Sequence, residues 1–101
     1  MVLGHEACGA VKGACDGVEL GNLTALLSKI KPAIDAVDGH DGNRNSKNSE
    51  FVAEVIEANV RQTVADIRAK SEVLAEMEKN GEIKIVGALY SLQDGSVTLL
   101  D

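Results

Sequence analysis

At 101 residues, with 45% hydrophobic but only 2% aromatic residues, the chain is one domain at most and builds its core from aliphatic side chains. Its net charge of −6 opposes binding to the phosphate backbone of nucleic acids and to anionic membrane surfaces. The sequence shows neither a signal-peptide pattern nor an apolar run that could span a bilayer. We therefore expect a cytoplasmic protein without nucleic-acid or membrane partners.

The chain begins with a predicted strand and turn that carry its most reactive side chains. The run Val2-Leu3-Gly4 is apolar throughout, as in strands buried between helices, and a short helix is predicted over residues 9–15. Between them lie His5 and Cys8, whose imidazole nitrogen and thiolate sulfur are ligands that zinc prefers. A zinc site needs three or four protein ligands, so this pair amounts to half of one.

Other donors close to this pair are disfavoured by geometry. If the intervening residues are helical, Cys15 lies about 10 Å from Cys8, too far for a disulfide or a shared metal ion. Glu6 points away from the pair if His5 and Cys8 converge. We therefore predict two free thiols. A His-x-x-Cys pattern by itself is a weak signal that is common by chance, and its alternative interpretation is a buried cysteine beside a capping histidine.

A helical region and a polar loop follow. Apolar residues recur at three- and four-residue spacing over 22–37, with Asn22 as the predicted N-cap and Pro32 as a predicted break in the helix. The segment 38–49 is polar and rich in turn formers, which predicts a surface loop. We interpret His40, inside that loop, as a solvated side chain rather than a metal ligand.

Two more helices are predicted in the second half of the chain. An amphipathic pattern that starts at Ser49 indicates a helix of about five turns. Asn59 falls on its apolar stripe, and we interpret it as a boundary residue that bonds to backbone rather than as a site residue. Ser71 then caps a short helix, which Asn80-Gly81 is predicted to end.

The chain closes with two predicted strands. Residues 82–90 are rich in β-branched side chains and follow helices, so a helical crossover that places them parallel to the first strand is expected. Asp94-Gly95 is typical of a tight hairpin, and the alternation over 96–100 predicts an antiparallel edge strand. The predicted fold class is α/β, with two parallel strands joined by a helical crossover plus a C-terminal antiparallel hairpin strand.

Two strings of residues in this chain match a known pattern. The first is Val-Leu-Gly-His5-x-x-Cys8-Gly9-Ala10-Val11-Lys12, and the second runs from Gly81 to Tyr90 and continues through a hairpin to Leu99. The first string resembles the zinc-ligand segment of β-class carbonic anhydrases, and the second resembles that family's last parallel and closing antiparallel strands. The resemblance implies that residues 1–101 form a single, partial β-carbonic-anhydrase-like domain, representing the C-terminal part of the family pattern.

The resemblance also implies a role for individual residues. By resemblance, His5 and Cys8 are two zinc ligands, and the Gly9 backbone amide contacts the substrate anion. The family draws a further cysteine from an upstream Cys-x-Asp-x-Arg segment that this sequence lacks, and it usually has aspartate where this chain has Ser91. In the family, zinc lowers the pKa of bound water so that hydroxide attacks carbon dioxide. We therefore expect an incomplete zinc site and, from this chain alone, little or no carbonic anhydrase activity.

The same resemblance bears on partners. The substrates implied are carbon dioxide and bicarbonate. In the family, the strand that bears the upstream cysteine pairs beside the strand ending at His5, so we expect an open apolar edge at Val2-Leu3-Gly4 and homo-oligomers formed through it or through exposed helix faces. Two other hypotheses remain: a non-catalytic anion-binding or assembly module derived from the same fold, and an unrelated small α/β domain.

Overall fold

Three short strands form one mixed sheet in the part of the chain that the computed structural model describes, residues 1–38 and 42–100. Strand β1 (Val2–His5) pairs in parallel with β2 (Gly87–Tyr90), and β3 (Val97–Leu100) pairs antiparallel with β2, in the order β1-β2-β3. The predicted α/β class, the parallel pair and the antiparallel last strand are confirmed.

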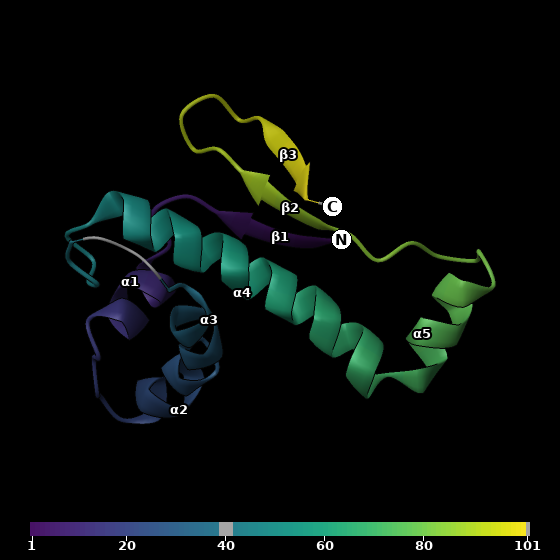
Figure 1. Ribbon diagram of the computed structural model, residues 1–101, viewed down its shortest axis with the longest axis horizontal. Coiled ribbons are helices and arrows are strands. Elements are labelled where there is room, and N and C mark those ends of the chain that lie inside the picture. Colours follow the sequence, from purple (N-terminus) through teal and green to yellow (C-terminus); the bar gives the residue numbers. More distant parts are fainter. Residues whose placement is uncertain (39–41, 101) are drawn as a thin grey trace.

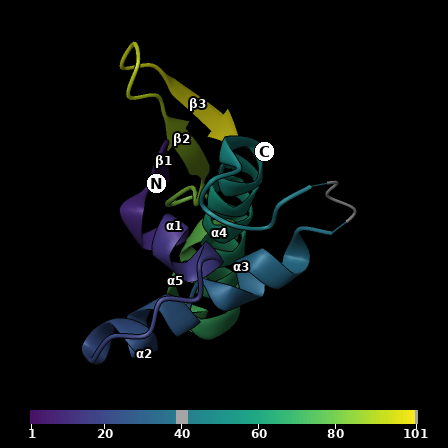
Figure 2. The ribbon, with the colours of Figure 1, turned by 90° about the vertical axis from the view of Figure 1, so that its left-hand side faces the viewer.

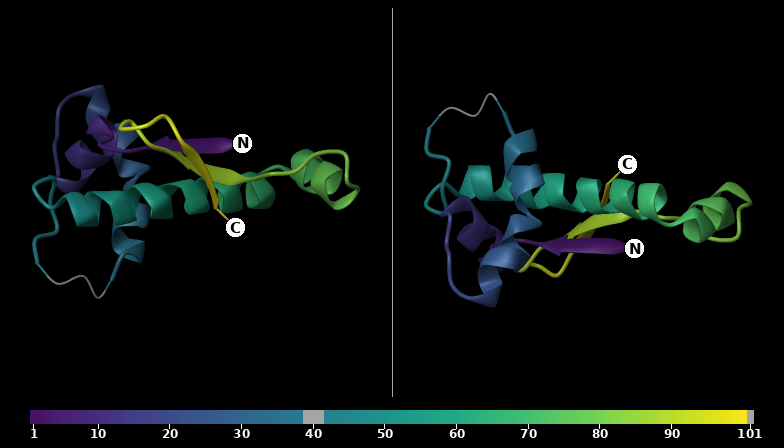
Figure 3. Two further views of the ribbon diagram at one scale, coloured as in Figure 1. Left: turned by 90° about the horizontal axis from the view of Figure 1, so that it is seen from above. Right: turned by 90° about the horizontal axis from the view of Figure 1, so that it is seen from below.

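The described residues also form five helices, which follow β1 and precede β2. They are α1 (Gly9–Cys15), α2 (Asn22–Ser28), α3 (Lys31–Ala36), α4 (Ser49–Lys70) and α5 (Glu72–Lys79). Helix α4 runs along the long axis of the molecule, with α1 to α3 gathered near its first turns and α5 at its far end (Figures 1 and 3). None of the helices in the described part of the chain combines the length and apolarity that crossing a membrane requires.

The helices start and stop close to the predicted positions, with two differences. The predicted break at Pro32 is confirmed, because α2 ends at Ser28 and Pro32 lies in the first turn of α3, where its missing N–H costs no helical hydrogen bond. Asn22 is not the N-cap: Gly21 takes that position, with φ of 52° and no side-chain cap. Helix α4 has 22 residues, about one turn more than predicted.

The caps of α4 and α5 show why these helices begin where they do. The Asn48 side chain accepts a hydrogen bond from the Phe51 N–H at the start of α4. Ser71 ends α4 and caps α5, since its hydroxyl oxygen accepts from the Leu74 N–H at 3.2 Å, as predicted. Helix α5 stops at Asn80, and Gly81 follows with φ of 78°, which confirms the predicted end signal.

Glycines on the sheet allow α4 to pack closely against it. A Cβ at Gly4 would lie 2.6 Å from Cγ2 of Val60, and one at Gly87 would lie 2.8 Å from Cγ1 of the same valine. Real Cβ atoms do not approach other atoms this closely, so any larger residue at either position would push the helix away. The sheet face that carries Gly4 and Gly87 is therefore covered by α4 at β1 and β2.

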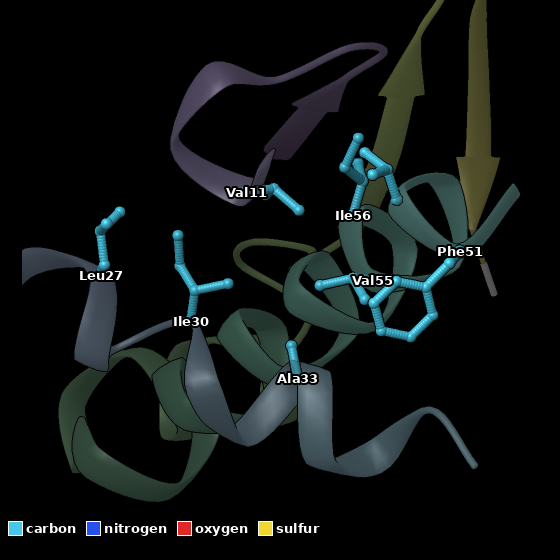
Figure 4. Packing of buried hydrophobic residues seen from close by; sticks show 8 residues of the cluster. Val11, Leu27, Ile30, Ala33, Phe51, Val55 and Ile56 are labelled. Atoms are coloured by element: carbon cyan, nitrogen blue, oxygen red, sulfur yellow. The ribbon is translucent and has the colours of Figure 1, made fainter. Parts of the chain in front are cut away.

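The hydrophobic core lies where the first turns of α4 meet α1, α2 and α3, and Leu89 of β2 packs against it. Figure 4 shows these side chains converging from all of these helices. The cluster is aliphatic apart from one ring, that of Phe51, which is fully buried. Its buried members are Val11, Leu27, Ile30, Ala33, Phe51, Val52, Val55 and Ile56.

The predicted strand over 82–90 is wrong in its first half. Only Gly87–Tyr90 are in the sheet, because their parallel partner β1 begins at Val2, whose N–H donates to the Val86 carbonyl at 2.8 Å. The segment before β2 satisfies its backbone elsewhere. Arg68 donates to the Ile85 carbonyl, and the Ile85 N–H donates to Glu78, both at 3.0 Å.

The final hairpin is wider than the predicted tight turn. Six residues, 91–96, join β2 to β3. Within them the Ser91 N–H donates to the Ser96 carbonyl, and the Gly95 N–H donates back to the Ser91 carbonyl, both at 2.9 Å. Gly95 has φ of 75°, which explains the glycine at this position.

Candidate metal centre

The two candidate ligands flank a sharp turn between β1 and α1. His5 is the last residue of β1, and Cys8 immediately precedes α1. The turn residues between them are held in place by the Glu6 N–H, which donates to the Tyr90 carbonyl at 3.2 Å. Ala7 has φ of 51°, in the left-handed region that non-glycine residues seldom adopt. Such a turn brings the residues at its two ends to within about 7 Å between Cα atoms.

The His5 ring is exposed and has one nitrogen available for a metal. Its Nδ1 lies 2.9 Å from the Glu6 carbonyl oxygen, which can only accept a hydrogen bond. Nδ1 therefore carries the proton and donates it, and this leaves the lone pair on Nε2. Fixing the tautomer through a backbone carbonyl is a common feature of metal-binding histidines. The sequence pattern could not reveal this bond, because it depends on the turn geometry.

The two cysteines are both free thiols, as predicted. Cys8 is half-buried and packs partly against the core cluster. Cys15, at the other end of α1, is also half-buried, and burial together with the adjacent Asp16 carboxylate raises the pKa of its thiol. Because a metal binds the thiolate, both effects disfavour Cys15 as a ligand. The separation of the two sulfurs by α1 agrees with the prediction that they do not share an ion.

The described residues of one chain do not fit a complete zinc site. A catalytic zinc takes three protein ligands and a structural zinc takes four, whereas His5 and Cys8 supply two. Across residues 1–38 and 42–100, no three or more His, Cys, Asp or Glu side chains are grouped so that they could hold one metal ion. The assignment of His5 and Cys8 as ligands stays a prediction, and no reaction step can be derived from this donor set.

The other residues singled out from the sequence have different surroundings. Gly9 is exposed, with open space around the position of a Cβ, and its predicted contact with a substrate anion stays a prediction. Ser91 belongs to the hairpin, where its hydroxyl accepts from the Gln93 N–H at 3.3 Å. Asn59 is half-buried on α4, and its carbonyl accepts from the Thr63 hydroxyl. His40 lies outside the described residues.

A cavity of about 540 Å³ lies beside the turn, at the carboxyl ends of β1 and β2. Its polar lining includes Glu6, Lys12, Ser49 and Tyr90, and its apolar lining includes Val52. We predicted no role for Lys12 or Tyr90. The strand topology could have predicted the position of this cavity, because ligands of open α/β sheets bind outside the carboxyl ends of the parallel strands. Neither His5 nor Cys8 lines this cavity.

Sequence comparison identifies the family. A family model described as carbonic anhydrase matches residues 1–97. Carbonic anhydrase 2 of Mycobacterium tuberculosis is 31% identical over 101 residues, covering 100% of this chain and 48% of that protein. A carbonic anhydrase of Mycolicibacterium smegmatis is 32% identical over 104 residues, covering 98% of this chain and 47% of that protein. The chain thus spans about half the length of these relatives.

Solved structures agree with the sequence comparison at the level of the fold. The β-carbonic anhydrase CafA of Aspergillus fumigatus superposes with a TM-score of 0.74 at 24% identity, covering 98% of this chain and 46% of that chain. CafD of the same fungus gives a TM-score of 0.64 at 19% identity, with 98% and 54% coverage. The chain therefore belongs to the carbonic anhydrase family and has, over about half of its relatives' length, the fold of the β class.

Proposed function

We propose that this chain carries the His-x-x-Cys part of a β-class carbonic anhydrase, an enzyme for the reversible hydration of carbon dioxide to bicarbonate, and that alone it has little or no activity. The observation that supports this proposal is the donor count at the β1–α1 turn. His5 and the free thiol Cys8 are two candidate ligands, and the described residues contain no group of three or more side chains that could hold a metal. An ion held by two protein ligands is bound weakly.

Stopped-flow measurement of carbon dioxide hydration tests this proposal. The wild-type chain, Cys8→Ser and His5→Ala are each supplied with zinc and compared with buffer containing the same zinc concentration. We expect no rate above the buffer control for any of the three proteins. Turnover by the wild type comparable with that of full-length family members, lost in both variants, would overturn the proposal.

A second candidate function is a non-catalytic module for assembly or anion binding. The observation that favours assembly is the sheet itself: among the described residues, β1 pairs with β2 on one side and has no partner strand on its other edge. Under this hypothesis the protein self-associates. Sedimentation of protein purified without chelator, at tens of micromolar, tests it, and a monomer under those conditions would count against assembly.

A further inference from the structure

A second cavity, of about 460 Å³, lies at the end of the sheet opposite the β1–α1 turn. Figure 2 shows the sheet on one side of α4 and helices α2 and α3 on the other. The cavity lies on the sheet side, where the second half of α4 meets the start of β2 and the end of β3. Its volume falls within the range of about 300–1,000 Å³ that is usual for sites of small organic ligands.

One part of the cavity wall is apolar. Its apolar side chains come from α4, from the segment that enters β2, and from the end of β3. They are Val64, Ala65, Ile85, Val86, Leu99 and Leu100. A ligand that covers these side chains removes apolar surface from water, so the wall favours a ligand with an apolar body.

Charged side chains form another part of the wall, and three of the four are cations. Arg68 and Glu78 are joined by two hydrogen bonds of 2.8 and 3.0 Å, and Arg61 pairs with Glu57 at 3.3 Å. The remaining cation, Lys84, is exposed and forms no ion pair within the part of the chain that the structure describes. The cavity therefore has one positive charge in excess, although the chain as a whole has a net charge of −6.

The same cavity already holds one carboxylate of the chain itself. Glu78 accepts hydrogen bonds from the Arg68 guanidinium and from the Ile85 N–H, and these lower its pKa most. Lys84 adds to that effect through its charge alone, so its ammonium acts on carboxylates in this cavity. One excess positive charge matches a ligand with a single negative charge better than it matches a doubly charged phosphate.

We propose that this cavity binds a small organic carboxylate with an apolar chain, its carboxylate beside the Lys84 ammonium and its chain against the apolar wall that includes Val64 and Ile85. None of the candidate metal-centre residues His5, Cys8 and Gly9 lines the cavity, so the inference does not depend on the proposed function.

Titration of the isotope-labelled full chain with octanoate, followed by the amide signals in NMR spectra, tests the proposal. We expect saturable shifts around the cavity, at Ala65, residues 84–87 and Leu100, with a Kd of about 1 mM or lower. From hexanoate through octanoate to decanoate, each added methylene should tighten binding about threefold, because more apolar surface leaves water. Octanol and octylamine have the same chain without the carboxylate and should bind at least about fivefold more weakly.

Two pairs of variants separate the charge from the apolar wall. Lys84→Gln should weaken octanoate binding roughly fivefold, whereas Lys79→Gln, at an exposed lysine of α5 outside the cavity, should leave it unchanged. Ala65→Leu fills space along the apolar wall and should weaken binding of all three carboxylates. Ala69→Leu, one turn farther along α4 and outside the cavity, is its matched control. All four positions are exposed, so circular dichroism should show folded chains throughout.

Four results would each overturn the proposal: no saturable shifts up to about 10 mM octanoate, equal affinity for octanol, unchanged affinity in Lys84→Gln, or shifts centred elsewhere in the chain. Tighter binding of octyl phosphate than of octanoate would overturn the assignment of a singly charged ligand. A chain that binds no carboxylate here leaves the proposed function standing, because the hydration assay concerns His5 and Cys8, which lie outside this cavity.

Discussion

The two faces of the three-stranded sheet differ sharply although the same twelve strand residues form both. On one face, Gly4 and Gly87 let α4 approach so closely that Val60 fills the space where side chains would stand. The opposite face, here called the outer face, carries Leu3, His5, Ala88, Tyr90, Val97 and Leu99. On it Leu3, Val97 and Leu99 are 49% to 62% exposed, while the small Ala88 in the central strand is buried. Packing against α4 is thus close at β1 and β2, whereas large apolar side chains on the face that carries His5 remain exposed. The candidate ligand His5 and these exposed apolar side chains lie on the same face of the sheet.

Truncating one large side chain in the core around α4 and one on the outer face should give the largest difference in the free energy of unfolding. Phe51→Ala removes a fully buried ring from the cluster around α4 and should lower the free energy of unfolding by about 3–5 kcal/mol. Leu99→Ala, on the outer face, should change it by less than about 0.5 kcal/mol. Urea unfolding followed by circular dichroism measures both. Similar losses in the two variants would mean that the outer face is covered.

Adding a methyl group on the sheet face that packs against α4 should lower the free energy of unfolding by a smaller amount. Gly4→Ala places a Cβ against Cγ2 of Val60 and should cost about 1–3 kcal/mol by overpacking. Because the shortest contact of the added Cβ is with Val60, Val60→Ala should partly relieve the clash, so the double variant should lose less than the sum of the two single losses. Additive losses in the urea midpoints would show that α4 does not pack against Gly4 as described.

The sequence predicted the elements well where local chemistry decides them. Ser71 capped α5, Pro32 divided α2 from α3, and an apolar run at Val2 to Gly4 formed a strand, because caps, proline and hydrophobicity act over a few residues. The predicted strand began too early, before Gly87, for a different reason. Those residues have strand-like composition, but a strand also needs a partner, and β1 begins at Val2.

The candidate site was only half predictable. The His-x-x-Cys spacing located both donors, but the bond from His5 Nδ1 to the Glu6 carbonyl depends on a turn in which Ala7 has positive φ. Placing His5 on the uncovered face required the register of β1 against β2, which composition does not reveal. The cavity beside Tyr90 depends in the same way on tertiary contacts.

The ion pair that joins the end of α4 to α5 should make a modest, pH-dependent contribution to stability. Arg68 on α4 pairs with Glu78 on α5 through two hydrogen bonds of 2.8 and 3.0 Å. These bonds, together with one from the Ile85 N–H, lower the pKa of Glu78 from near 4.5 to about 2. Since the folded state lowers this pKa, the stabilisation is present above about pH 4.5 and is lost as the pH falls through about 2.

Melting curves of wild type and Glu78→Gln between pH 6 and pH 2 test this linkage. The wild type should melt higher at pH 6, and the difference should shrink toward zero as Glu78 is protonated in the folded state. Glu76→Gln, at an exposed position on the same helix, is the matched control and should show little difference at any pH. A constant gap between wild type and Glu78→Gln down to pH 2 would contradict the assignment.

The contrast between the two faces can be measured most directly by paramagnetic relaxation of methyl signals in solution. A soluble gadolinium chelate is added to the metal-free, methyl-labelled chain at a concentration where it is monomeric. The methyl signals of Leu3, Val97 and Leu99 should broaden strongly, while those of Val60 and Val64, both buried under the sheet, should stay sharp. Equal protection of the two sets would contradict the claim that this chain leaves the outer face, and with it His5, uncovered.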